Sequence, residues 1–179
     1  MEDGPHKKII KALCTEQLLP LGVFQKGTSR TYIDDNGWFF TVIEFQPSDW
    51  SKGTYLNVAM HFLWNEKQYI SFDFADRFCR VGEYIAYEND EQFTREVAKY
   101  VAEAAKWVKF YRKLCDPKAA KRYAKKWALL HPNHRGVDQL RMVERLDDDE
   151  VVQRIRRTRT FWRSQPSMKK MKHNSVYDG

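Results

Sequence analysis

The sequence predicts an α+β protein with an N-terminal helix, an antiparallel meander of four to five strands, and then a layer of three to four helices packed on one sheet face. Apolar residues recur every three to four positions before residue 20 and after residue 89, and every second position between these limits. The predicted strands also follow one another without the long crossovers that a parallel sheet requires. These observations favour an antiparallel sheet covered by helices.

The chain of 179 residues is 42% hydrophobic and 15% aromatic, which provides enough apolar surface for a folded core. We expect a single domain over residues 6–165, with a helix and the sheet in residues 6–88 and a basic helical part in residues 89–165. Residues 166–179 have little apolar content and are predicted to form a mobile tail.

The first predicted helix covers residues 6–19, because its apolar side chains have helical spacing and Pro20 follows as a stop signal. After this helix the apolar side chains instead recur at every second position. Strands are predicted over residues 24–33 and 38–45, joined by a hairpin turn at Asn36-Gly37.

Residues 46–53, QPSDWSKG, are predicted to form a loop, because proline cannot donate to a sheet ladder and serine, aspartate and glycine favour turns. The third strand covers residues 54–64, and a fourth covers residues 69–74. Residues 79–87 form either a fifth strand or a buried loop. Four or five strands follow from this pattern.

Helical spacing predicts a long helix over residues 90–114. Asp116-Pro117 then supplies an N-cap and a first-turn proline for a helix that ends at His131-Pro132. A short helix is expected over residues 136–146, and Asp147 with Glu150 fits a capping box that opens the last helix.

Three short motifs occur in the predicted sheet: Lys26 to Tyr32, Gln46 to Trp50, and Tyr55 with Asn57. Together with a preceding helix that ends in Leu-Pro-Leu-Gly, they resemble the family catalogued as domain of unknown function 4304. The resemblance covers about residues 6–130, and the spacing between Lys26-Gly27 and Tyr32 departs from the family pattern. It implies the fold and a bacterial origin, but no mechanism.

Alternation assigns two faces to the sheet, and the face of Leu56, Val58 and Met60 is the predicted core face under the long helix. The opposite face gathers the side chains of Glu44, Gln46, Tyr55, Asn57, His61, Tyr69, Ser71 and Asp73. A histidine near carboxylates suits general acid-base catalysis, so His61 with Glu44 or Asp73 is the candidate catalytic set. A solvated sheet face is the simpler interpretation.

Trp38, Phe40 and Val42 share this second face, which favours a binding surface over a catalytic one. The candidate binding residues at this end of the sheet are Gln46, Trp50, Tyr55 and Asn57.

The charge is unevenly distributed: residues 1–90 hold 9 Lys and Arg against 13 Asp and Glu, whereas residues 91–179 hold 22 against 11. Such a cationic half attracts acidic protein surfaces or phosphates. The candidate binding cations are Lys121, Arg122, Lys125, Arg154, Arg156, Arg157 and Arg159. The aromatic residues among them have the spacing of a helical core.

No metal or cofactor is expected. His131 and His134 lack further ligands nearby, and no phosphate-binding or zinc-peptidase motif occurs. The three cysteines, Cys14, Cys79 and Cys115, match neither a disulfide framework nor a catalytic pattern, which favours a reducing cytoplasm. No stretch is apolar enough to predict a membrane span or a signal peptide.

No motif specifies a reaction. The sequence favours a non-enzymatic protein-binding or interaction module, whose partner is an acidic protein or a second copy of the chain. The alternatives are a nucleic-acid-binding protein that uses the helices after residue 117, and a small enzyme that uses His61. An immunity- or defence-associated role is a hypothesis from this class of protein rather than from particular residues.

Overall fold

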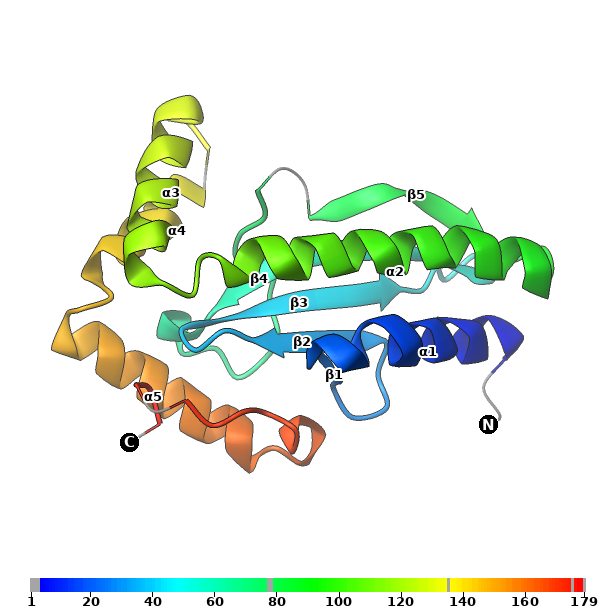
Figure 1. Ribbon diagram of the computed structural model, residues 1–179, viewed down its shortest axis with the longest axis horizontal. Helices are drawn as coiled ribbons and strands as arrows, with labels where there is room; N and C mark the ends of the chain where they lie inside the picture. Colours follow the sequence, from blue (N-terminus) through cyan, green and yellow to red (C-terminus); the bar gives the residue numbers. More distant parts are fainter. Residues whose placement is uncertain (1–3, 77–78, 135, 175, 179) are drawn as a thin grey trace.

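The computed structural model describes residues 4–76, 79–134, 136–174 and 176–178. It confirms the α+β class: an N-terminal helix leads into an antiparallel sheet, and helices follow the sheet (Figure 1). The α-helices are α1 (Pro5–Gln17), α2 (Asp90–Arg112), α3 (Pro117–Leu130), α4 (Gly136–Arg141) and α5 (Asp149–Ser164).

The sheet has five strands in the order of the chain, and each strand pairs antiparallel with the next. The strands are β1 (Phe24–Gln25), β2 (Thr31–Asp35), β3 (Phe39–Gln46), β4 (Gly53–Phe62) and β5 (Arg80–Ala86). Between β2 and β3, the Asn36 N–H donates to the Phe39 carbonyl at 3.0 Å, and Gly37 has a φ of 87°. The predicted Asn-Gly hairpin is therefore confirmed, as is the loop after β3.

Two strand predictions are wrong. The single strand expected over residues 24–33 is split into β1 and β2 by a turn, because Gly27 has a φ of 57° and the Ser29 N–H donates to the Lys26 carbonyl. The fourth strand expected over residues 69–74 is reduced to one bridge, between Met60 and Phe74. Residues 79–87 are predicted to form either a fifth strand or a buried loop, and the strand is confirmed, because β5 lies within this range.

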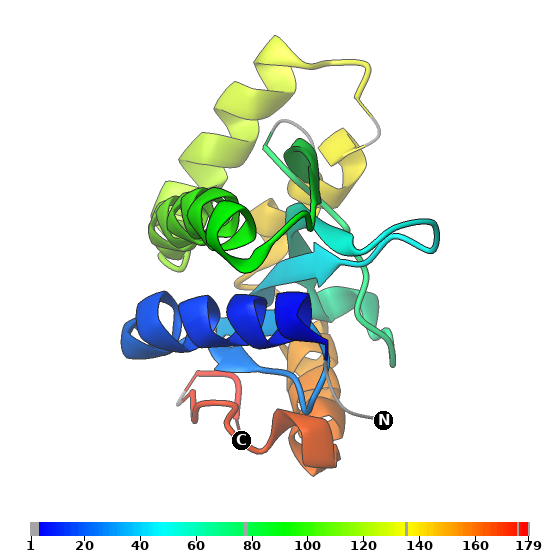
Figure 2. The ribbon, with the colours of Figure 1, turned by 90° about the vertical axis from the view of Figure 1, so that its right-hand side faces the viewer.

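One face of the sheet packs against α1 and α2 (Figure 2). Its residues Leu56, Val58 and Met60 are buried, which confirms the predicted core face. Where α2 ends, Arg112 reaches this face and pairs with the buried Asp34 at 2.6 Å. The core therefore lies between the sheet and these two helices.

The last helix, α5, lies against the opposite face, and this differs from the expected layer on one face only. Trp162 packs edge-on to Phe40 at 6.4 Å and to His61 at 6.0 Å between ring centres. This end of the second face carries Phe40, Val42 and Ala59, all fully buried. A sheet with apolar side chains on both faces needs cover on both, and α5 supplies the second cover.

The C-terminal segment is packed rather than mobile, so the tail prediction is wrong for the residues that the structure describes. Met168, Met171 and Tyr177 are buried, and the Ser167 carbonyl accepts a hydrogen bond from the Gly27 N–H at 3.0 Å. The segment has few apolar side chains, but these three pack against the rest of the protein. Asp178 adds a charge that the core requires.

Arg159 on α5 has no exposed surface, so its positive charge needs a buried partner such as the Asp178 carboxylate. Its guanidinium donates to Asp35 at 2.6 Å and to Asp178 at 2.6 Å, and also to the carbonyls of Gly37 and Lys172. One buried cation thus joins the end of β2, α5 and the C-terminal segment. Both carboxylates hold the pKa of Arg159 above its usual range, although burial alone would lower it.

We expect Arg159→Met to lower the free energy of unfolding by about 3–5 kcal/mol, because Asp35 would be left buried without its counter-charge and Asp178 would keep only the ion pair with Arg163. Urea unfolding followed by tryptophan fluorescence measures the change. Arg157→Met is the matched control, since Arg157 is exposed and pairs with Glu66 at the surface. Equal losses in the two variants would contradict the role assigned to Arg159.

Candidate interaction site

The cationic residues predicted on α5 are largely occupied within the molecule. Arg159 is buried, so it is wrong as a surface-binding residue. Arg154 and Arg157 both pair with Glu66, at 3.5 and 2.8 Å, and Arg156 donates to the carbonyl of Val176. Carboxylates of the acidic first half of the chain therefore pair with three of these four arginines.

The cations of α3 have a different environment. This helix contains five Lys and Arg residues and no acidic residue. Lys121 pairs with Asp147 at 2.5 Å. The other four are exposed and have no ion-pair partner among the residues that the structure describes: Lys118, Arg122, Lys125 and Lys126. We call these four residues the α3 cations.

The helices α3 and α4 extend beyond the end of the sheet, at the C-terminal end of α2 (Figure 1). They pack mainly on each other and on the turn that follows α4. Proline at the first position and the Asp116 side chain, which accepts hydrogen bonds from two backbone N–H groups, fix where α3 begins. The pair forms a helical hairpin that projects from the body.

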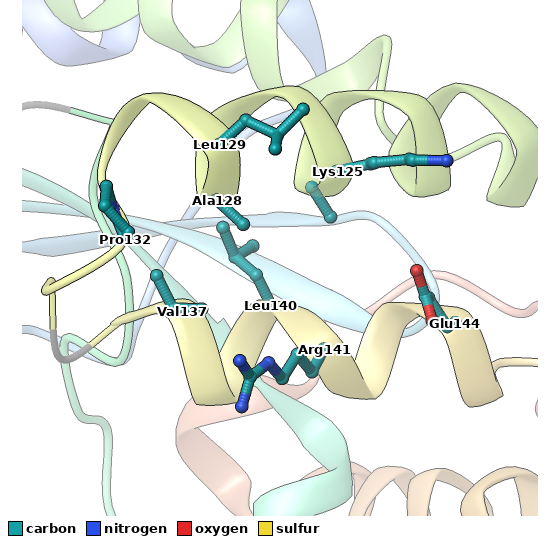
Figure 3. A pocket seen from close by; sticks show the side chains of 9 residues that line it. Lys125, Ala128, Leu129, Pro132, Val137, Leu140, Arg141 and Glu144 are labelled. Carbon is teal, nitrogen blue, oxygen red and sulfur yellow. The ribbon is translucent and has the colours of Figure 1, made fainter.

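An apolar groove with a volume of 480 Å³ lies between these helices and is called here the α3–α4 groove. Figure 3 shows Ala128 and Leu140 pointing toward each other between the two helices. The groove is lined by Ala124, Lys125, Ala128, Leu129, Pro132, Val137, Leu140, Arg141 and Glu144. Leu129 is 76% exposed at its edge. Apolar surface of this kind, rimmed by charges, is typical of a protein-binding site.

A second cavity, of 710 Å³, lies on the other side of α3 and is called here the Asp76 cavity. Two hydrogen bonds position Asp76 in its wall: the Tyr123 hydroxyl donates to the Asp76 carboxylate, and Trp127 Nε1 donates to the Asp76 carbonyl at 3.2 Å. Leu130, His131 and His134 complete its wall. The outer surface of α3 is therefore flanked by a cavity on each side.

Sequence reasoning missed Leu129 and Leu130, which are 76% and 65% exposed. The available signal was their position: both lie outside the helical stripe of Ala120, Ala124 and Trp127 that packs inward. Apolar residues off the buried stripe of an amphipathic helix indicate a surface with another use.

The candidate catalytic residues do not form an accessible site. His61 Nδ1 lies 3.0 Å from Ser71 Oγ and 3.6 Å from Asp73, and Lys67 pairs with Asp73 at 2.6 Å. However, His61 has no exposed surface. Glu44 lies elsewhere, hydrogen-bonded to Asn57 at 3.0 Å. The cluster around His61 therefore joins β4 to the segment that follows it, out of reach of a substrate.

Burial lowers the pKa of His61 to about 4, against the opposing effect of the Asp73 carboxylate. Burial would raise the pKa of Asp73, but hydrogen bonds from Lys67, the Phe62 N–H and Ser71 hold it below its usual value. At neutral pH the cluster thus contains a neutral imidazole beside a carboxylate paired with a lysine.

The other end of the second sheet face is polar and partly open. Asn57 donates to Gln46 at 2.8 Å, and Arg80 donates to Gln46 at 3.0 Å while its guanidinium lies 3.9 Å from the ring centre of Tyr55. The predicted residues Gln46, Tyr55 and Asn57 are therefore brought together. Trp50 is separate, at the tip of the loop between β3 and β4.

Neither a cluster of metal ligands nor an activated thiol is found in the part of the chain that the structure describes. Among the described residues, no group of three or more His, Cys, Asp or Glu side chains is arranged to hold a metal ion. Burial raises the pKa of Cys14 to about 12, and those of Cys79 and Cys115 to about 11. Thiols with such pKa values are poor nucleophiles at neutral pH.

Comparisons with protein-family models, with curated proteins and with solved structures found no match to this chain. The resemblance to domain of unknown function 4304 therefore stays a prediction. Within the described residues, none of the helices combines the length and the hydropathy that crossing a membrane requires.

We expect the stability to fall by about 2 kcal/mol between pH 7 and pH 5 through His61 alone. The unfolded chain binds a proton at this histidine near pH 6.5, whereas the folded protein does so only near pH 4, so unfolding takes up a proton between these values. The loss begins as the pH falls below 6.5 and is complete below 4. Urea unfolding at each pH measures it.

His61→Asn is the comparison variant, because asparagine does not titrate in this range. Its stability should depend less on pH between 7 and 5 than that of the wild type. The same pH dependence in both proteins would show that His61 is not the group responsible.

Proposed function

We propose that this protein is a protein-binding module, and that its α3–α4 hairpin binds an acidic, partly apolar segment of a partner. The observation that carries the proposal is the apolar α3–α4 groove beside the α3 cations. A partner segment with leucine-like side chains fills the groove, and its carboxylates pair with the cations. An immunity- or defence-associated role is compatible with such a module and stays a hypothesis.

The two kinds of contact contribute differently. Burying one leucine side chain stabilises a complex by about 1.5–3 kcal/mol, whereas an exposed ion pair contributes up to about 1 kcal/mol. Leu129 and Leu130 are both largely exposed in the free protein. The apolar contact therefore provides most of the affinity, and the α3 cations speed association and select acidic partners.

The composition of this surface supports a protein over a nucleic acid. Proteins that bind single-stranded nucleic acid hold the bases by stacking them on exposed aromatic rings. On α3, Trp127 is 5% exposed and the Tyr123 hydroxyl is engaged with Asp76. Exposed leucines and the carboxylate of Glu144 at the groove rim have no role in binding phosphates. A mixed apolar and cationic surface suits an acidic peptide segment better.

A photo-crosslinking residue in place of Leu129 tests the proposal in cells. We expect it to capture one or a few defined proteins, because the side chain at this position lies at the edge of the α3–α4 groove. Mass spectrometry identifies the captured proteins. Adding Lys125→Glu and Lys126→Glu should reduce the capture at least several-fold, since like charges repel an acidic partner.

Two controls accompany this experiment. The same crosslinker in place of Val176, which is 58% exposed on the C-terminal segment, should not capture the same proteins. Lys169→Glu with Lys170→Glu changes two other exposed lysines by the same amount and should leave capture at position 129 intact. Identical capture at both positions, or capture of nucleic acid alone, would refute the proposal.

A further inference from the structure

The Asp76 cavity lies where the end of α2, one side of α3 and the segment before β5 meet. Phe74 anchors that segment, because its buried ring lies 4.9 Å from the ring of Trp127 between centres. Phe110 of α2 lies edge-on to Tyr123 of α3 at 5.9 Å. Packed aromatic rings thus hold the surroundings of a cavity whose volume, 710 Å³, is typical of small-molecule sites.

Asp76 is held in place but has an unused acceptor. Its N–H donates to the Tyr111 hydroxyl at 3.1 Å, Trp127 donates to its carbonyl, and Tyr123 donates to carboxylate oxygen Oδ1. The other carboxylate oxygen, Oδ2, accepts no hydrogen bond from the described residues, and none of their cations pairs with this carboxylate. A half-buried anionic group with a free oxygen therefore lines the cavity.

One cation lines the same cavity. Lys126 follows Tyr123 by three residues, so it lies about one helical turn further along the same face of α3. It is exposed and pairs neither with Asp76 nor with another carboxylate among the described residues. The other ionisable groups of the lining, besides Tyr123, are His131 and His134. The cavity thus contains one carboxylate and one ammonium group that do not pair with each other.

We propose that the Asp76 cavity binds a free α-amino acid with an aromatic or large apolar side chain. Its ammonium group donates to Asp76 Oδ2, its carboxylate pairs with Lys126, and its side chain covers Leu130, which is 65% exposed. A zwitterion uses both unpaired charges, whereas a ligand with a single charge uses only one of them. The cavity is separate from the α3–α4 groove, so this inference does not depend on the proposed function.

The two charged contacts differ in strength because they differ in burial. Asp76 is half-buried and held in place, so a hydrogen bond to its carboxylate raises the affinity about tenfold or more. Lys126 is exposed and its long side chain must be ordered, so its ion pair contributes about fivefold or less. With one apolar side chain in addition, a ligand of this size binds with a Kd of about 1 mM.

An NMR titration with L-phenylalanine tests the proposal. The indole N–H of Trp127 donates to the Asp76 carbonyl at 3.2 Å, so its signal reports on this cavity, and its absence in Trp127→Phe assigns it. We expect this signal to shift and to saturate with a Kd of about 1 mM. The indole signal of Trp50, which is 95% exposed on the β3–β4 loop, detects non-specific binding and should not move.

Two analogues and two variants separate the two charges. Phenethylamine lacks the carboxylate and should bind the wild type about fivefold more weakly than L-phenylalanine, whereas 3-phenylpropionate lacks the ammonium group and should bind at least about tenfold more weakly. Asp76→Asn should weaken L-phenylalanine and phenethylamine about tenfold without weakening 3-phenylpropionate. Lys126→Met should weaken L-phenylalanine and 3-phenylpropionate about fivefold without weakening phenethylamine.

Lys125→Met is the matched control, because Lys125 is an exposed lysine on the side of α3 that lines the α3–α4 groove. It should bind all three ligands like the wild type. Asparagine keeps an acceptor for the Tyr123 hydroxyl, and thermal unfolding checks that each variant folds. The order of the three ligands on the wild type needs no variant, so it tests the proposal even when Asp76→Asn does not fold.

Three outcomes overturn the proposal: no shift of the Trp127 signal at about 10 mM L-phenylalanine, an analogue with a single charge that binds as tightly as L-phenylalanine, or equal losses in Lys125→Met and Lys126→Met. The expected order of ligands, together with no protein captured at position 129, would refute the proposed function and keep the amino-acid site. Capture at position 129 without binding of L-phenylalanine would do the reverse.

Discussion

Arg159 has no contact with water, and its guanidinium lies between Asp35 at the end of β2 and Asp178 near the C-terminus. A buried cation is tolerated only when every part of it is paired, so the last helix and the C-terminal segment are held in one arrangement relative to the sheet. This constraint explains why α5 covers the second sheet face and why a segment of low hydropathy is nevertheless packed. The C-terminal segment is part of the folded body because it carries a charge that the interior needs.

With the core face and one end of the second face covered, the three most exposed large hydrophobic side chains lie on the α3–α4 hairpin and on the β3–β4 loop. The α3–α4 hairpin projects beyond the C-terminal end of α2, and the Trp50 loop lies near its N-terminal end. The hairpin packs on the core through Trp127, whose ring centre lies 4.9 Å from that of Phe74, but Leu129, Leu130 and Trp50 stay in contact with water. Exposed apolar groups on projecting elements are what protein recognition uses, because their burial in a complex contributes more than surface charges do. The exposed leucines of the hairpin therefore account for the proposed binding site.

The two basic helices show how the same composition leads to different roles. On α5 the arginines meet Glu66, Asp35 and Asp178, and their charge is used within the protein. On α3 four of five cations meet no carboxylate among the described residues, and the helix is next to an apolar groove. The α3 cations therefore add exposed positive charge beside the α3–α4 groove.

The sequence by itself determined the local features: the Asn36-Gly37 hairpin, the alternation of β3 and β4, and the start of α3 at Asp116-Pro117. These depend on backbone preferences and on periodicity, which neighbouring residues set. Only the tertiary structure decided that His61 is buried, that Arg159 is paired and that Leu129 borders a groove. Each of these depends on contacts between segments far apart in the chain, such as α5 with β2. A periodic pattern shows that a face is apolar or charged, but not which distant element will cover it.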